Sequence, residues 1–156
     1  MGNALKTPVS RSRLRLLAEF RFRLRLFLQF SEAASLRFGL QPQQHQLLLQ
    51  IAGAPKGAVA TIRYAAERLG LRHNTAVELS NRCEEAGLIT RRQDEVDRRC
   101  VHLELTGKGE EILHALSVDH ALELNELAPQ LIETLGTLSG APCEKKKRKV
   151  WEDHEV

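Results

Sequence analysis

Two short stretches of helical character, joined by a very short connection, limit the fold of this chain more than any other feature. In ATIRYAAERLG, apolar residues recur at helical spacing, Thr61 can cap the start and Gly70 can end the helix. The link GLRH leads directly into NTAVELSNRCEEAGL, which Gly87 closes. The narrow face of this second stretch consists of Ala76, Leu79, Ser80, Cys83 and Ala86. Two short helices joined by a turn of three or four residues that contains Gly are typical of a helix-turn-helix.

The pattern changes period directly after these helices. In LITRRQDEVDRRCVHLEL, apolar residues alternate at Val101, Leu103 and Leu105, which is the spacing of a half-buried strand. The polar connector QDEVDR predicts a hairpin. We expect its tip to carry Arg91, Arg92, Arg98 and Arg99. The order of helix, helix-turn-helix, hairpin and helix predicts a winged helix, a mainly α fold with one small β-hairpin.

The opening segment, RLRLLAEFRFRLRLFLQF, alternates apolar and mostly polar residues from Arg13 to Phe30, as a strand would. However, it is longer than an ordinary strand and contains no Val, Ile or Thr, whereas Leu, Arg, Ala, Glu and Gln favour helices. We therefore predict a long helix between Ser10 and Gly39. Its apolar side chains would lie on nearly all sides, so the helix should be buried against both its own domain and a partner subunit.

The remaining segments complete a four-part division. A short helix with Pro42 in its first turn should follow Gly39, and a helical pattern resumes at Thr106. Pro129 should interrupt that pattern and begin a last helix that runs through Leu138. The predicted parts are an N-terminal dimerisation helix (1–40), a winged helix-turn-helix (41–106), C-terminal dimerisation helices (107–138) and a charged flexible tail (139–156). The expected dimer contacts are Leu14, Leu17, Phe20, Leu24, Phe27, Leu122 and Leu135.

Composition favours one ordinary folded domain in the cytoplasm. The chain has 156 residues, of which 42% are hydrophobic and 28% are charged, so neither a disordered nor a membrane protein is expected. No apolar run is long enough to span a bilayer, and the first residues lack a secretory signal. Three widely spaced cysteines argue against a disulfide framework and for a reducing compartment.

Charge is distributed unevenly along the chain. Residues 1–40 carry eight Lys and Arg against two Glu, whereas residues 104–134 carry seven acidic residues against one Lys. One end could therefore meet a polyanion, the two ends could meet each other, or both could be solvated faces of opposite sign. We expect some arginines of the first helix (Arg13, Arg15, Arg21, Arg23 and Arg25) to meet the acidic C-terminal helices across a dimer.

The outer face of the second short helix has the residue types that read DNA. Asn and Thr can contact base edges, Val can contact a thymine methyl group, and Arg can hold phosphate. A charged hairpin beside such a helix can reach the backbone or the minor groove. The predicted DNA-binding residues are His73, Asn74, Thr75, Val77, Glu78, Arg82, Arg91, Arg92, Asp97, Arg98 and Arg99.

From about Leu36 to His120 the chain resembles the MarR (multiple-antibiotic-resistance regulator) family of winged-helix transcription factors. The resemblance depends on LQPQQHQLL, on the helix-turn-helix stretch, and on the spacing of EEAGLITR, DRR and LTGKG. It implies a cytoplasmic homodimer that binds a palindromic DNA operator, with recognition helices in major grooves and wings in minor grooves. It also implies a repressor that a small aromatic or phenolic ligand releases.

Individual positions follow from the same resemblance. His73, Asn74, Thr75, Val77 and Glu78 match the base-facing start of the recognition helix, and Arg82 matches an arginine that faces the backbone. Asp97 and Arg99 match a wing pair in which the acid orients the arginine, a role that Arg98 could share. Two positions depart from the pattern: Cys83 replaces the usual Leu, and Glu95 with Val96 replaces a wing tip that contains Pro.

Other activities have little support in the residues. Because there is no phosphate-binding Gly loop and no nucleophile elbow, an enzyme is not expected. His114 and His120 are six residues apart, so they do not form a zinc pair, and neither a metal nor another cofactor is predicted. Cys83 should be buried, and Cys100 should lie at the base of the wing, so a thiol switch is a secondary hypothesis.

Two alternatives remain open at the level of sequence. Residues 56–106 carry nine basic against eight acidic residues, and Glu78 lies on the recognition face, so the winged helix could instead be a protein-interaction module without specific DNA recognition. The segment KKKRKV near the end could be a solvated tail or an accessory phosphate contact.

Overall fold

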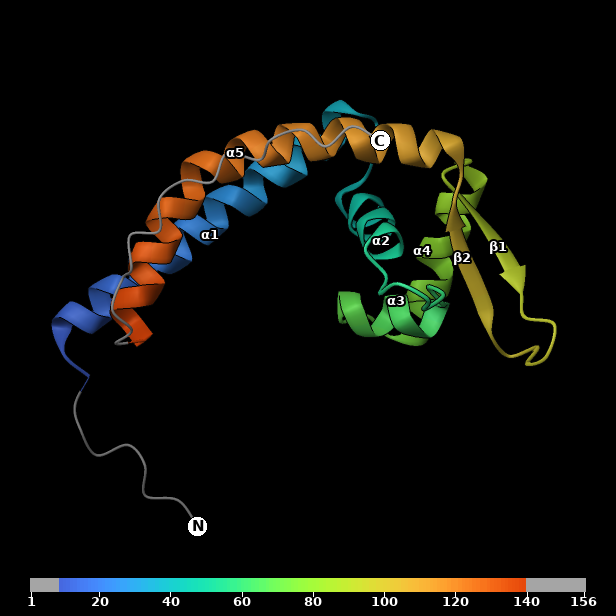
Figure 1. The fold of residues 1–156 in the computed structure, drawn as a ribbon, viewed down its shortest axis with the longest axis horizontal. Coiled ribbons are helices and arrows are strands. Elements are labelled where there is room, and N and C mark those ends of the chain that lie inside the picture. The colour runs from blue at the N-terminus through green and yellow to red at the C-terminus, as the bar shows by residue number, and fades with distance from the viewer. Residues whose placement is uncertain (1–8, 140–156) are drawn as a thin grey trace, which may run out of the picture. The chain divides into compact units, whose positions relative to one another are not determined.

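The computed structural model describes residues 9–139, and Figure 1 shows the arrangement of its helices and strands. The elements are α1 (Arg11–Arg37), α2 (Pro42–Ala52), α3 (Ile62–Leu69), α4 (His73–Glu85), β1 (Ile89–Gln93), β2 (Val101–Leu105) and α5 (Gly107–Ser139). Residues 27–124 form one compact unit, and the described residues 9–26 and 125–139 belong to a second. The mainly helical fold with one antiparallel hairpin confirms the predicted fold class.

Helix α1 confirms that the alternating segment is a helix and not a strand. Its start is capped by Ser10, whose Oγ accepts a hydrogen bond from the backbone N–H of Arg13 at 3.3 Å. Gly39, with a φ of 74°, ends the turn that follows the helix. The buried residues of the helix are Ser31, Ala34 and Ser35, all of which lie in the 27–124 unit.

Helices α3 and α4 form the predicted helix-turn-helix. Thr61 caps α3, because its side chain accepts a hydrogen bond from the N–H of Tyr64 at 3.1 Å. Gly70 takes the left-handed conformation (φ 63°) that ends α3, and α4 begins three residues later. Ala76, Leu79, Ser80 and Cys83 are buried, as predicted, but Ala86 is exposed because α4 has already ended at Glu85.

Strands β1 and β2 form the wing. They pair antiparallel from Ile89 with Leu105 at the base to Gln93 with Val101 beside the loop. On its other edge β2 pairs with Thr61 through an isolated bridge at His102, and the N–H of Leu103 donates to the carbonyl of Ala60 at 2.7 Å. Strand β2 therefore pairs with backbone on both edges. Strand β1 pairs with a strand on one edge only, and Glu84 accepts the backbone N–H of its Arg91 at 3.1 Å.

The hydrophobic core of the 27–124 unit joins the helix-turn-helix to the wing and to the first half of α5. Fully buried side chains come from α2 (Leu47, Leu48), α4 (Leu79), β2 (Leu103) and α5 (Leu116). Burying each such leucine stabilises the fold by about 1.5–3 kcal/mol. Helix α4 and the wing are thus held by one common core.

The first turn of α5 packs tightly on the segment that ends α4. Thr106 donates its N–H to the carbonyl of Leu88 at 3.1 Å and its hydroxyl to the carbonyl of Gly87 at 2.7 Å. Lys108 Nζ donates to the carbonyl of Ala86 at 2.8 Å. A Cβ atom on Gly109 would lie 2.1 Å from the carbonyl oxygen of Leu88. Only glycine therefore fits at this approach of two backbones.

The predicted break at Pro129 is wrong, because α5 continues through it to Ser139. A proline inside a helix removes one hydrogen bond and crowds the preceding turn. Pro129 and Asn125, the residue four positions earlier whose carbonyl loses its partner, are both exposed. Water can therefore satisfy that carbonyl, which lowers the cost of a continuous helix.

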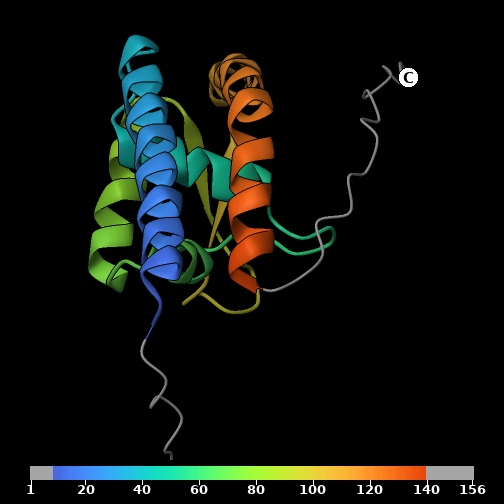
Figure 2. The same cartoon turned by 90° about the vertical axis from the view of Figure 1, so that its left-hand side faces the viewer.

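The second unit consists of the first half of α1 and the last half of α5, as far as the structure describes them. In both Figure 1 and Figure 2 these two segments run alongside each other in opposite directions. Leu127 and Thr134 are buried, seven residues apart and therefore on one face of α5. Within residues 9–139, none of the helices combines the length and apolar character that a membrane crossing requires.

Candidate nucleic-acid interface

The outer face of α4 displays the predicted base-reading residues. His73, Asn74 and Glu78 are exposed, whereas Thr75 and Val77 are half-buried. Arg72, at the N-cap, makes no side-chain capping hydrogen bond, and the first turn of α4 contains no acidic residue. The backbone N–H groups of that turn can therefore bind a phosphate, which the helix dipole also favours.

The far side of the same helix faces the core. Ser80 donates its hydroxyl to the carbonyl of Ala76 at 2.7 Å, so the buried hydroxyl is satisfied inside the helix. Burial of Cys83 raises the pKa of its thiol to about 11, although Arg82 acts in the opposite direction. Arg82 itself is exposed and lines a cavity with Leu79 and the start of α2.

The wing loop between β1 and β2 is shaped by two aspartates. Asp94 Oδ1 accepts the backbone N–H groups of Val96 at 2.8 Å and Asp97 at 2.7 Å. Asp97 in turn accepts the backbone N–H of Arg99 at 3.0 Å. The predicted pairing of Asp97 with Arg99 is therefore made through the backbone, and it orders the loop without binding the guanidinium.

Two arginines extend from this loop. Arg98 and Arg99 are both exposed, and the Arg98 carbonyl accepts a hydrogen bond from Gln93 Nε2 at 2.7 Å. Within residues 9–139 neither guanidinium has a hydrogen-bonding partner or an ion pair. The ordered backbone thus presents two cations to solvent, an arrangement suited to an anionic groove.

The structure corrects the placement of the other two wing arginines. Arg91 and Arg92 lie within β1 and not at the tip, since the strand extends to Gln93. The Arg91 guanidinium bonds to Asn81 Oδ1 and lies 3.8 Å from Glu84 Oε2, so it fastens the wing to α4. Arg92 reaches Glu104 across the hairpin at 3.4 Å.

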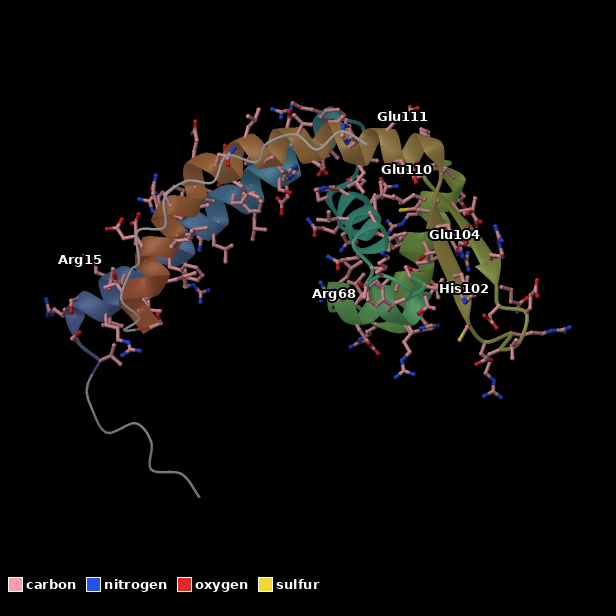
Figure 3. All side chains as sticks on the ribbon, in the orientation of Figure 1. Arg15, Arg68, His102, Glu104, Glu110 and Glu111 are labelled. Carbon is pink, nitrogen blue, oxygen red and sulfur yellow. The ribbon has the colours of Figure 1, made fainter. Side chains whose placement is uncertain are left out.

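Sequence reasoning missed a pair on the wing. His102 Nε2 lies 3.1 Å from Asp94 Oδ2, and both side chains are about one-quarter exposed. In Figure 3 His102 lies on β2 closer to the loop than Glu104 does. The segment QDEVDR does contain a turn signal, because an Asp often accepts the backbone N–H groups two and three residues ahead. Its His partner could not be predicted in this way, because the pairing depends on the register of the two strands.

The prediction that Cys100 lies at the base of the wing is wrong, because this residue lies at the loop end of β2. Its Sγ is 3.7 Å from Asp97 Oδ2. Desolvation, followed by the charge of Asp97, raises the pKa of this thiol, so neither Cys83 nor Cys100 is an activated thiolate. Cys143 and the KKKRKV segment lie outside the described residues. Within residues 9–139 no group of three or more His, Cys, Asp or Glu could hold a metal ion.

A polar cluster that the sequence did not predict lies between α1, α2 and α5. The His120 ring donates from Nδ1 to the Leu116 carbonyl at 2.6 Å, and its Nε2 forms a hydrogen bond of 2.8 Å with the Ser31 hydroxyl. His45 lies 5.0 Å away between ring centroids and lines a cavity of about 200 Å³ with Ser35 and other residues of α1 and α2. Among the described residues, nothing forms a hydrogen bond with its buried Nδ1. Burial, followed by the charge of His120, lowers the pKa of His45 to about 4.

Comparison with known proteins connects this geometry to one family. The sequence model of the MarR family matches residues 38–99, which include α2, α3, α4, β1 and the wing loop to Arg99. The transcriptional repressor MprA of Escherichia coli (strain K12) is 44% identical over 45 residues, 29% of this chain and 26% of MprA. The chain therefore matches about a quarter of the length of this curated relative.

Solved structures agree over a longer range. AbsC, a MarR family transcriptional regulator from Streptomyces coelicolor, has a TM-score of 0.67 and 21% identity, covering 88% of this chain and 92% of its own. CouR from Rhodococcus jostii RHA1, solved with p-coumaroyl-CoA bound, has a TM-score of 0.56 and 20% identity, covering 78% and 88%. At these identities the similarity establishes a common fold.

Proposed function

We propose that the chain is a member of the MarR family, whose sequence model matches residues 38–99, and that it acts as a homodimeric transcriptional repressor that binds a specific DNA sequence. The observation that carries this proposal is the exposed start of α4 on the same core as an ordered wing with two unpaired arginines, Arg98 and Arg99. Among the described residues, the first turn of α4 and the wing loop together offer N–H groups, polar side chains and cations to one duplex. Major-groove and minor-groove contacts would then be made by separate elements.

Dimerisation is supported by apolar surface that the single chain leaves exposed. On α1, Leu14 is 53% exposed and Leu17 and Leu24 are each 40% exposed. On α5, Leu122 is 65% and Leu135 is 45% exposed. Phe20 and Phe27 are half-buried. Burying these side chains against a second copy would contribute about 25 cal/mol for each Å² of apolar surface removed from water. Two recognition helices related by a two-fold axis would read a palindromic operator.

Repression and release by a ligand are proposed from the relatives. MprA is a transcriptional repressor, and CouR was solved with p-coumaroyl-CoA bound. In this chain the cavity beside His45, lined by Ser31, Ser35 and Leu28, could accept a small aromatic or phenolic effector. The unpaired Nδ1 of His45 offers that ligand a hydrogen bond.

The test begins with DNA that the protein itself selects from a random double-stranded pool. Fluorescence anisotropy with the selected duplex should give an affinity far above that for an unselected duplex, and it should fall steeply with salt. Light scattering should give a dimer. Equal affinity for selected and unselected DNA, together with a stable protein partner, would instead favour the protein-interaction module. The observation in favour of that alternative is the acidic side chain of Glu78, which is exposed on α4.

The Arg99→Ala variant tests the wing. Loss of one groove contact should weaken binding to the selected duplex about tenfold and reduce the salt dependence, without changing thermal stability. The matched control is Arg37→Ala, since Arg37 pairs with Asp119 at 3.1 Å between α1 and α5. Wild-type affinity in Arg99→Ala, or an equal loss in both variants, would contradict the role of the wing.

A further inference from the structure

The geometry points to Asp94 and His102 as a protonation-dependent clamp that positions the wing loop, residues 94–100, for DNA. The inference rests on the proposed function and adds a form of regulation to it. His102 Nε2 and Asp94 Oδ2 are 3.1 Å apart, within range of an ion pair when the imidazole is charged. Asp94 directly follows β1 and His102 lies near the start of β2, so their contact joins the two sides of the wing beside the loop.

One half of the clamp is the loop itself. While Oδ2 of Asp94 faces His102, its Oδ1 accepts the N–H groups of Val96 and Asp97. The backbone N–H of Asp94 also donates to the carbonyl of Cys100 at 3.0 Å. The carboxylate therefore connects the histidine to the backbone that precedes Arg98 and Arg99. Any change in its position moves the loop that carries both cations.

The other half is a rigid platform. His102 is the residue of β2 that is opposite Arg92 on one edge and bridged to Thr61 on the other. The neighbouring hydrogen bond from Leu103 to Ala60 is short, at 2.7 Å. The imidazole thus connects a strand that is held on both edges to the loop that carries Arg98 and Arg99.

The charged groups around the pair are engaged elsewhere. Arg92 pairs with Glu104 on the hairpin, and Arg63, from α3, pairs with Glu67 at 3.1 Å. Asp97 accepts hydrogen bonds from Arg99 N–H and the Cys100 thiol. Asp94 is the carboxylate placed to gain from a positive charge on His102.

Protonation of His102 should strengthen the clamp. Histidine side chains titrate between pH 5 and 8, and a charge-assisted hydrogen bond is stronger than a neutral one. The N–H groups of Asp97 and Val96, and then the nearby His102, keep the pKa of Asp94 below its ordinary value, so its carboxylate stays ionised over that range. The wing loop is therefore held most firmly at acidic pH, and the affinity for DNA should decrease as pH rises.

The first experiment observes the clamp without DNA. In the ¹⁵N-labelled full chain, NMR titration from pH 5 to 8 should move the backbone amide signals of Val96 and Asp97 in step with the His102 imidazole. In Asp94→Asn, which keeps an oxygen for both N–H groups but removes the charge, the two amides should stop following His102. Amides that do not move, or that move equally in Asp94→Asn, would overturn the clamp whatever the protein binds.

The second experiment measures DNA affinity at pH 6 and pH 8 on the selected duplex. The ratio of DNA affinity at pH 6 to that at pH 8 should be about two- to fivefold larger in the wild type than in His102→Gln. This is the range that a partly exposed ion pair supports. In an Asp94→Asn background, His102→Gln should have no further pH effect. His114→Gln is the matched control, because His114 is on α5 and not on the wing. His73 is unchanged in every protein compared, so it does not contribute to the differences between them.

These results separate the two proposals. If the amides follow His102 but the pH dependence of DNA binding is the same in wild type and His102→Gln, the positioning role is overturned. If the chain binds no DNA specifically at either pH, the proposed function fails, while the amide titration still decides whether the clamp exists.

Discussion

Replacing Gly109 by alanine should destabilise the fold through one steric contact. The new Cβ would lie 2.1 Å from the Leu88 carbonyl oxygen and 3.1 Å from its carbon, whereas ordinary van der Waals contact begins at 3.4 Å. The obstacle is backbone, and Leu88 and Ile89 are only 2% and 1% exposed. The start of α5 must therefore move away by about 1.3 Å.

That movement breaks the contacts that hold α5 to the end of α4. The hydrogen bonds from Thr106 to Leu88 and from Lys108 to Ala86 contribute about 1 kcal/mol each, and overpacking costs a further 1–3 kcal/mol. Together they predict a loss of about 3–5 kcal/mol in the free energy of unfolding.

Urea denaturation followed by circular dichroism, at one fixed protein concentration, measures this loss. Gly107→Ala is the matched control, since a Cβ there meets no atom within 4 Å. Helix propensity should leave that variant unchanged or stabilise it by up to about 1 kcal/mol. If both variants unfold at the same urea concentration, the packing of Gly109 on Leu88 is not as described.

Two further predictions concern the 27–124 unit. Thr61→Ala removes the cap of α3 and should cost about 1 kcal/mol in thermal or urea unfolding, whereas Thr61→Ser should retain most of it; equal losses would exclude capping as the cause. His45 has a pKa of about 4 in the fold against an ordinary 6.5, so the unfolded chain binds its proton more readily. The free energy of unfolding should therefore be highest above pH 6.5 and fall by roughly 2 kcal/mol toward pH 4. In His45→Phe this fall should be smaller. If the urea midpoints of the variant depend on pH as those of the wild type do, other groups cause the fall.

The local elements of this fold could be predicted from sequence because each has its own period and end signals. The absence of β-branched residues identified α1 as a helix, Thr61 and Gly70 marked the bounds of α3, and alternation at Val101 and Leu103 marked β2. These signals depend on residues close in sequence. The continuity of α5 through Pro129 could not be read in that way, because it depends on whether the freed carbonyl reaches water.

The site could be predicted as a set of exposed residues, but not as a network. Arg91 looked like a DNA contact, and only the register of β1 against α4 turns it toward Asn81 and Glu84. His102 and Asp94 are eight positions apart and meet only through the hairpin. The contact of His45 with His120 joins α2 to α5 across 75 positions, a distance at which composition and spacing give no signal.

The anchoring of Arg91 fixes α4 and the wing relative to one another, so they form one rigid unit. Its side chain bonds to Asn81 on α4, and its backbone N–H donates to Glu84 at 3.1 Å. Its guanidinium Nε is buried and has no hydrogen-bond partner within residues 9–139. Because the wing cannot swing independently of α4, the protein fixes the distance between the two grooves that α4 and the wing would enter. A duplex bound as proposed would then adapt its own groove width and twist to that separation. Sequence preference could thus extend to base pairs that no side chain touches, through the cost of deforming them.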